Sequence, residues 1–148
     1  MEENFMKQAL KEAQKAYDKL EVPVGAVIVK DNKIIARAHN LKEQKNSALA
    51  HAELLAISKA TKKLANWRLS DCEMYVTLEP CPMCMGAIIS SRIQKLYIGA
   101  PDLKAGACGS KINLNDGSLN HSVIIEKDVL KPVCEKLIKD FFKCLRNK

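Results

Sequence analysis

Two short motifs hold residues whose types and spacing suit a metal-dependent hydrolytic site. Cys81 and Cys84 stand three positions apart directly after Pro80, and His51 precedes Cys81 by 30 positions. Two cysteine thiolates and one imidazole can bind a divalent ion such as zinc and leave one tetrahedral position open for water. Glu53, two residues beyond His51, is then free to act as general acid and base. The spacing therefore predicts a hydrolase with three protein ligands and one proton shuttle.

The elements around the cysteines suggest how the thiols could ionise. Pro82 suits the first turn of a helix because it lacks the N–H group that would stay unpaired there. A helix over 81–90 would place both sulfur atoms at its positive end, which favours thiolate. Strands are expected at 74–77 and 95–99, on either side of this helix. That order predicts parallel pairing, with the cysteines at the carboxyl end of a strand, where ligand sites lie.

The histidine motif needs a special geometry. A helix is expected over 50–64, and residues two apart on a regular helix point to nearly opposite sides. His51 and Glu53 can therefore face one metal ion only if the first turn or the approach of the chain arranges it.

The remaining elements follow from periodicity and turn residues. Strands at 24–29 and 33–39 form a hairpin that Asn40 closes. Trp67 is either a core residue or a stacking surface, and the core is the favoured interpretation. A short strand is expected at 123–125, after a loop region at 101–118. A helix is expected at each end of the chain. The first is capped by Asn4 and has an apolar stripe of Met6, Leu10, Ala13, Tyr17 and Leu20. The last is capped by Asp128 and carries on one face Leu130, Val133, Leu137, Phe141 and Leu145.

Composition indicates one domain over residues 1–148, with 47% hydrophobic and 28% charged residues. No apolar run approaches the roughly 20 residues of a membrane span, and the acidic start does not look like a secretory signal, so we expect a cytoplasmic protein. In that reducing compartment the cysteines outside the metal motif are expected to be ordinary small apolar residues: Cys72, Cys108, Cys134 and Cys144.

The positive charge of the chain is compatible with a polyanionic partner. The formal net charge is +7 and the pI is about 9.1. Residues 127–148 alone hold seven Lys or Arg against three Asp or Glu. This favours nucleic acid, although a lysine-bearing helix face is often simply solvated.

The two motifs match the H-x-E and P-C-x-x-C pattern of zinc deaminases. Longer segments narrow the resemblance: the chain resembles the bacterial tRNA-specific adenosine deaminases nearly from end to end. The segments that carry this resemblance are 22–27, 51–53, 77–87, 91–93, 106–110, 120–121 and 140–142. The tail departs most, because 143–146 has fewer arginines than the family pattern.

The resemblance implies a three-layer α/β/α sandwich with a central mixed five-stranded sheet, of the cytidine deaminase-like type. It implies a homodimer with one Zn²⁺ per subunit that hydrolytically deaminates adenosine to inosine at the wobble position of a tRNA anticodon. By position in the family pattern, His51, Cys81 and Cys84 would bind zinc, Glu53 would move the proton, and Asn40 would hydrogen-bond the flipped base. The residues that would line the anticodon-loop groove are Asp102, Lys104, Asn120 and His121.

Two other functions stay open at this point. A deaminase of a free nucleobase or nucleoside, such as guanine or cytosine, would use the same catalytic residues. A structural zinc module would need a fourth ligand, for which His39, His121 or Cys72 are candidates, and would leave Glu53 without a purpose. An unpaired base in an RNA loop can enter a pocket without opening a duplex. The positive charge of the chain would attract the RNA phosphates, so both points agree with an RNA substrate.

Overall fold

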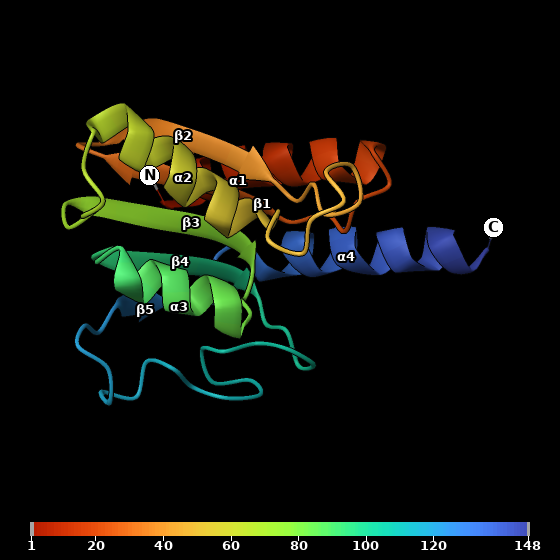
Figure 1. Cartoon of the computed structure of the whole chain (residues 1–148). Coiled ribbons are helices and arrows are strands. Elements are labelled where there is room, and N and C mark those ends of the chain that lie inside the picture. Colours follow the sequence, from red (N-terminus) through yellow and green to blue (C-terminus); the bar gives the residue numbers. More distant parts are fainter. Residues whose placement is uncertain (1, 148) are drawn as a thin grey trace.

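The computed structural model describes residues 2–147 as one mixed β-sheet between two layers of helices (Figure 1). In chain order the elements are α1 (Glu2–Asp18), β1 (Gly25–Lys30), β2 (Lys33–His39), α2 (Ala52–Leu64), β3 (Cys72–Leu78), α3 (Pro82–Ser90), β4 (Lys95–Ala100), β5 (Ile124–Glu126) and α4 (Lys131–Arg146). Helices α2 and α3 cover one face of the sheet, and α1 and α4 cover the other. This confirms the predicted three-layer fold.

The five strands lie in the order β2-β1-β3-β4-β5. β1 pairs antiparallel with both β2 and β3, whereas β3, β4 and β5 run parallel. The predicted hairpin and the predicted parallel pairing around α3 are both confirmed. Because the parallel strands share a direction, their carboxyl ends meet at one edge of the sheet, where α3 begins.

Helix α1 packs closely on β1 through small residues. Ala9 and Ala13 are fully buried, and a Cβ added at Gly25 would overlap the Ala9 carbonyl. The predicted cap at Asn4 is wrong, because the helix begins at Glu2 and has acidic residues in its first turn, where the helix dipole favours them. The predicted stripe also ends early: Leu20 lies beyond the helix with a φ of 62° and is exposed.

Helix α2 buries alanines rather than its larger apolar residues. Ala52, Ala56 and Ala60 are completely buried against β1 and β2, whereas Leu54, Leu55, Ile57 and Leu64 are half-buried. Small side chains let the helix approach the sheet closely. The helix begins at Ala52, two residues later than predicted, so that His51 becomes its N-cap residue.

Two predictions about the last helix are wrong. Its N-cap residue is Leu130, which has a φ of 53°, and no side chain caps it, so Asp128 does not. Val133 and Leu145 are exposed although they belong to the predicted apolar face. The C-terminal half of α4 extends past the sheet and contacts α1 instead, where Phe141 is buried with its ring centre 5.5 Å from that of Tyr17 (Figure 1). Pro132 stands in the first turn, where its missing N–H group costs nothing.

Trp67 and the four cysteines outside the metal motif differ in how deeply they are buried. Trp67 is 56% exposed, so its predicted place in the core is wrong, and Leu69 is buried there instead. Of the four cysteines expected to be ordinary small apolar residues, Cys72, Cys108 and Cys134 are buried and Cys144 is exposed. Among residues 2–147 there is no helix with the length and apolarity needed to cross a membrane.

Candidate active site

His51, Cys81 and Cys84 come together at the carboxyl edge of the parallel strands. The Nδ1 atom of His51 lies 3.7 Å from the sulfur of Cys81 and 3.4 Å from that of Cys84. All three donor atoms lie within 4.8 Å of one another. Zinc bonds of about 2.0–2.3 Å in a tetrahedron would separate such donors by roughly 3.5–3.8 Å. The donor set and its spacing therefore fit a zinc ion.

The starts of two helices meet at this cluster. His51 is the N-cap residue of α2 and Cys81 that of α3, while Cys84 lies in the first turn of α3. The positive helix ends favour negative charge at this point. A hydrogen bond to Cys84, together with His51, lowers the pKa of Cys81 to about 4. A hydrogen bond to Cys81 raises the pKa of Cys84, and burial raises it further. Both thiols must lose their protons to bind a metal ion.

Glu53 lies beside the cluster because the start of α2 is irregular. His51 has an extended backbone, with φ −80° and ψ 149°, so its side chain is not placed by helical geometry. Glu53 is in the first helical turn and is only 4% exposed. Burial raises the pKa of Glu53 to about 7, and a hydrogen bond with Cys84 acts in the opposite direction. A carboxyl group of this kind can both accept and return a proton near neutral pH.

A pocket of about 230 Å³ opens over the cluster. This is smaller than the roughly 300–1,000 Å³ of pockets for drug-sized ligands, so it suits a single base-sized group. Its lining combines apolar and polar residues: Val22, Val24, Asn40, Lys42, His51, Ala52, Glu53, Leu78, Glu79, Cys81, Asp102 and Ala105.

Asn40 is held in place within the pocket. Its Nδ2 atom donates a hydrogen bond to the Val22 carbonyl at 3.3 Å, and its Oδ1 atom accepts one from the Lys42 backbone N–H at 3.2 Å. An amide side chain has two donors and two acceptor lone pairs. One N–H and one lone pair of Asn40 are therefore left for a ligand.

Glu79 attaches the loop that follows β4 to the metal motif. Its carboxylate accepts hydrogen bonds from the backbone N–H groups of Asp102, Cys108 and Ser110 at 3.2, 2.9 and 3.2 Å, and also from the Ser110 hydroxyl. Burial opposes ionisation of Glu79, but the Ser110 and backbone hydrogen bonds together lower its pKa. The N–H groups of Asp102, Cys108 and Ser110 are therefore committed to Glu79 and hold the loop in place.

Sequence reasoning missed a second buried carboxylate, Glu21. It is 1% exposed and accepts hydrogen bonds from the backbone N–H groups of Glu43 and Gln44 at 3.0 and 2.7 Å. The loop between β2 and α2 is thereby fixed next to Asn40 and Lys42. Glu21 stands among ordinary helix-ending residues, and no local pattern distinguishes it from a solvated carboxylate.

The structure brings only part of the predicted RNA-binding set to the pocket. Asp102 lines it, and its Oδ1 atom accepts hydrogen bonds from Lys104 and Ala105 N–H at 3.0 and 3.1 Å. Lys104 points into a neighbouring groove with Phe142. Asn120 is exposed, and His121 lies near the amino ends of the parallel strands, where its Nε2 donates to the Ile93 carbonyl at 2.8 Å. RNA contacts by these residues stay a prediction.

The alternative of a closed four-ligand zinc site finds no support in the described residues. His39 bonds through Nδ1 to Glu12 at 2.9 Å, and His121 and Cys72 lie at the other end of the sheet. Within residues 2–147 the ligand cluster consists of His51, Cys81 and Cys84. Three candidate ligands beside a carboxyl group that is not a ligand are typical of a catalytic site rather than a structural one.

This fold and site define a deaminase of the cytidine deaminase-like class. The MafB19-like deaminase family matches residues 1–146. A curated protein from Bacillus subtilis (strain 168), named tRNA-specific adenosine deaminase, is 48% identical over 99% of this chain and 92% of its own length. The chain belongs to the family of tRNA-specific adenosine deaminases.

Solved structures similar to this chain include deaminases of more than one kind of substrate. A structure from studies of A-to-I editing by tRNA:A34 deaminases at the wobble position of transfer RNA has a TM-score of 0.85 and 37% identity, covering 90% of this chain and 98% of that one. Guanine deaminase from Bacillus subtilis has a TM-score of 0.65 and 31% identity, covering 99% of this chain and 94% of that one. The fold alone therefore does not distinguish an RNA substrate from a free base.

Proposed function

We propose that this protein hydrolytically deaminates adenosine to inosine at the wobble position of a tRNA anticodon. The observation that carries the proposal is the cluster of His51, Cys81, Cys84 and Glu53 at the base of a pocket for one base, in a chain so similar to tRNA-specific adenosine deaminases. The experiment that tests it compares an anticodon stem-loop carrying a wobble adenosine with free adenosine, cytidine and guanine.

His51, Cys81 and Cys84 would hold one zinc ion, because their donor atoms have the right type and spacing. A zinc ion bound there supplies Lewis-acid activation of a water molecule at neutral pH. Glu53 accepts the proton that the attacking water loses. It delivers this proton to the purine ring as the water oxygen bonds to C6, and then moves the remaining hydroxyl proton to the amino group, so that the C–N bond breaks, ammonia leaves and the oxygen at C6 becomes a carbonyl.

Asn40 orients the base. Its side chain is already fixed by Val22 and Lys42, so its free N–H and lone pair cost little entropy to use. The base must leave its stack to enter the pocket, which is least costly for an unpaired loop nucleotide. This favours an anticodon loop over duplex RNA.

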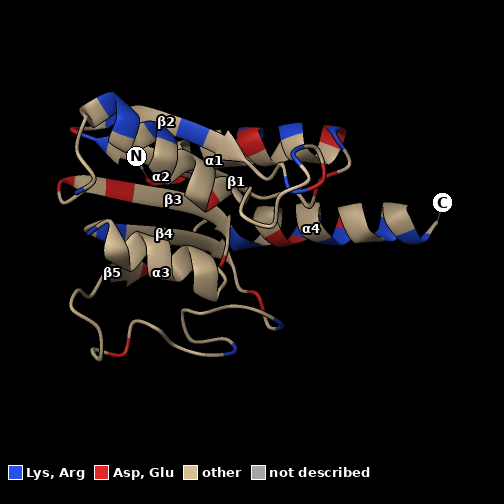
Figure 2. Cartoon of the chain, viewed as in Figure 1, with Lys and Arg blue, Asp and Glu red and all other residues tan. Residues whose placement is uncertain are grey.

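A basic groove next to the pocket supports the RNA substrate. It is lined by Lys104, Lys139 and Arg146 together with Phe142 and Ile138, and Phe142 is 41% exposed. Lys104 is two residues from Asp102 of the pocket, so the groove continues from the site. Lysine and arginine contact phosphates while an exposed aromatic ring can stack on a base. Figure 2 shows basic residues along α4, where this groove lies.

The homodimer and the cytoplasmic location belong to the same proposal, as does folding of residues 1–148 as one domain. Exposed apolar side chains of Met83 in α3 and of Ile112 and Leu119 in the long loop offer a surface for a second copy. Intact tRNA and reduced thiols both occur in the cytoplasm.

The second candidate is a deaminase of a free base. The similarity to guanine deaminase and the small pocket favour it. It does not account for the basic groove beside the pocket, and the paired assay separates the two.

A further inference from the structure

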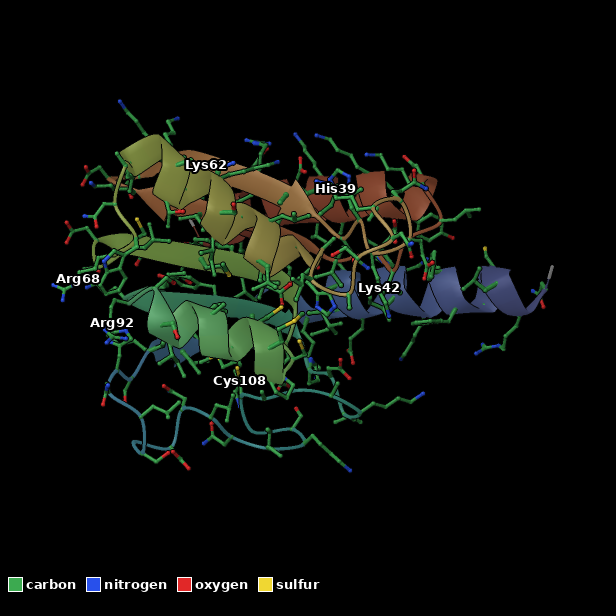
Figure 3. The ribbon with its side chains drawn as sticks, in the orientation of Figure 1. His39, Lys42, Lys62, Arg68, Arg92 and Cys108 are labelled. Carbon is green, nitrogen blue, oxygen red and sulfur yellow. The ribbon has the colours of Figure 1, made fainter. Side chains whose placement is uncertain are left out.

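A second pocket lies at the opposite edge of the sheet from the metal cluster. Ser70, Gln94 and Ser122 stand just before β3, β4 and β5, so the parallel topology gathers them at the amino ends of these strands. Arg68 and Arg92, together with His121 and Ile124, complete the lining of a cavity of about 410 Å³. Figure 3 shows both arginines at this edge, while Lys42 and His39 mark the other one. The pocket shares no residue with the one over the metal cluster, and His121 is the one residue in it that was predicted to contact RNA.

The polar groups of this pocket suit an anion. No aspartate or glutamate is among its lining residues, and within residues 2–147 neither guanidinium has a carboxylate within 4.0 Å. Arg92 uses Nη1 to bond the Ile89 carbonyl at 3.0 Å, which leaves further N–H donors. Hydroxyl groups of Ser70 and Ser122 and the amide of Gln94 add neutral donors. Paired arginines and hydroxyls are a phosphate-binding set.

Trp67 stands beside this pocket and is unusually open for its type. Its side chain is 56% exposed, and the guanidinium carbons of Arg68 and Arg92 lie 5.0 and 6.0 Å from its ring centre. The ring thus holds the two cations together near the cavity through cation–π attraction. Its remaining open surface can stack on a nucleobase, as exposed aromatic rings do in proteins that bind single-stranded nucleic acid.

We propose that Arg68, Arg92 and the strand-start residues form a site for the phosphate group of a nucleotide, whose base stacks on Trp67. The same chemistry is offered by the backbone of an RNA and by a free mononucleotide. The proposal does not depend on the deaminase function, because none of these residues lines the catalytic pocket.

The chain carries its own reporter for this site, since Trp67 is its single tryptophan. Tryptophan fluorescence of the zinc-loaded full chain is measured during titration with adenosine monophosphate, inorganic phosphate, adenosine and a full-length tRNA. We expect saturable changes with adenosine monophosphate, competition by inorganic phosphate, and a much weaker response to adenosine. A response to adenosine as strong as that to its monophosphate would overturn the phosphate site.

Two variants test whether the fluorescence response comes from binding at this pocket. Arg68→Gln is the test, because its side chain makes no recorded hydrogen bond within residues 2–147 and its loss should not disturb α3. We expect Kd for adenosine monophosphate to rise at least about tenfold, since a charge-assisted contact is removed. Lys62→Gln is the control, because Lys62 is an exposed cation on α2 outside the pocket. Equal weakening by both variants would refute the proposal, as would no response to any phosphate-bearing probe at millimolar concentration.

The probes also distinguish the source of the phosphate. Saturation by adenosine monophosphate with no competition from tRNA identifies a free nucleotide as ligand. A tRNA response that Arg68→Gln weakens and inorganic phosphate reverses identifies an RNA backbone. Deaminase activity is assayed separately, so failure of one proposal leaves the other measurable.

Discussion

The carboxylate of Glu79 occupies the space that a side chain at Gly106 would need. A Cβ at position 106 would overlap the carboxyl carbon and Oε2 of Glu79. Glycine therefore lets the loop after β4 come close enough for its N–H groups to reach this carboxylate. The loop carries Asp102 into the pocket, so this contact determines one wall of the site.

Gly106→Ala is expected to push the loop away from Glu79. We expect a loss of about 1–3 kcal/mol in the free energy of unfolding, typical of overpacking, and a lower kcat/KM. Chemical denaturation and the deaminase assay measure both. Gly86→Ala is the matched control, because a Cβ there meets no atom within 4 Å. Gly86 is inside α3, so alanine should be neutral or stabilising by about 0.5–1 kcal/mol. Equal damage by both variants would argue against the loop contact.

Glu79→Gln should change how stability depends on pH. Hydrogen bonds hold the folded-state pKa of Glu79 below its usual value of 4.5. The carboxylate therefore stabilises the fold fully above pH 4.5, and this contribution disappears as pH falls through the lower folded-state pKa. We expect the difference in unfolding free energy between the wild type and Glu79→Gln to be about 1–3 kcal/mol near neutral pH and to shrink in acid. A difference independent of pH would contradict an ionised Glu79.

Glu21→Gln should loosen the opposite wall of the pocket. The variant keeps the volume but weakens the hydrogen bonds to the Glu43 and Gln44 N–H groups. We expect kcat/KM to fall at least about tenfold, because Asn40 is no longer held in position. Zinc content should not change, since Glu21 is not among the ligands. Unchanged kinetics would show that the loop is held by other contacts.

Glu53→Ala and Cys84→Ala separate the proton shuttle from the metal ligands. We expect Glu53→Ala to retain zinc and to lose activity by at least about 10²-fold, because only an acid–base group is removed. Cys84→Ala should lose metal and part of its stability, because binding energy is partly folding energy. Metal analysis and thermal denaturation test both. Loss of zinc from Glu53→Ala, or one full zinc per chain in Cys84→Ala, would reverse these assignments.

The lysines of α4 should contribute to RNA affinity through charge. Lys139 lines the basic groove and Lys143 lies one helical turn further on. Replacing both with glutamine is expected to weaken binding of the stem-loop. The slope of the logarithm of the binding constant against the logarithm of salt concentration should become less steep by about 0.7–0.9 for each lost phosphate contact. Lys62→Gln combined with Lys63→Gln on α2 is the control of equal charge. An identical salt slope in the α4 variant and the wild type would remove these lysines from the interface.

The position of the candidate site was predictable because its chemistry depends on side-chain type and short spacing. The β3–α3–β4 unit places Cys81 and Cys84 at the carboxyl edge of the parallel strands, and the start of α2 brings His51 and Glu53 to the same edge. The sequence left open how His51 and Glu53, two residues apart, could face one metal ion. The answer is that His51 is the N-cap residue with an extended backbone, which depends on where α2 begins.

Features that depend on long-range packing were not predictable in the same way. Burial of Glu21 requires the loop before α2 to fold back over it, and nothing near Glu21 in the chain signals this. Trp67 is exposed because Leu69 occupies the core, a competition between two apolar residues that periodicity cannot decide. Leu145 is exposed because the end of α4 extends past the sheet, and the extent of the sheet depends on how all the strands pair.

The most direct test of the account is the paired deamination assay with purified, zinc-loaded protein. One reaction contains an anticodon stem-loop with adenosine at the wobble position, and the others contain the same stem-loop with adenosine moved elsewhere in the loop, or free adenosine, cytidine and guanine. The account predicts inosine in the wobble stem-loop alone. Deamination of a free base without reaction of the stem-loop would leave the zinc chemistry in place and contradict the RNA substrate.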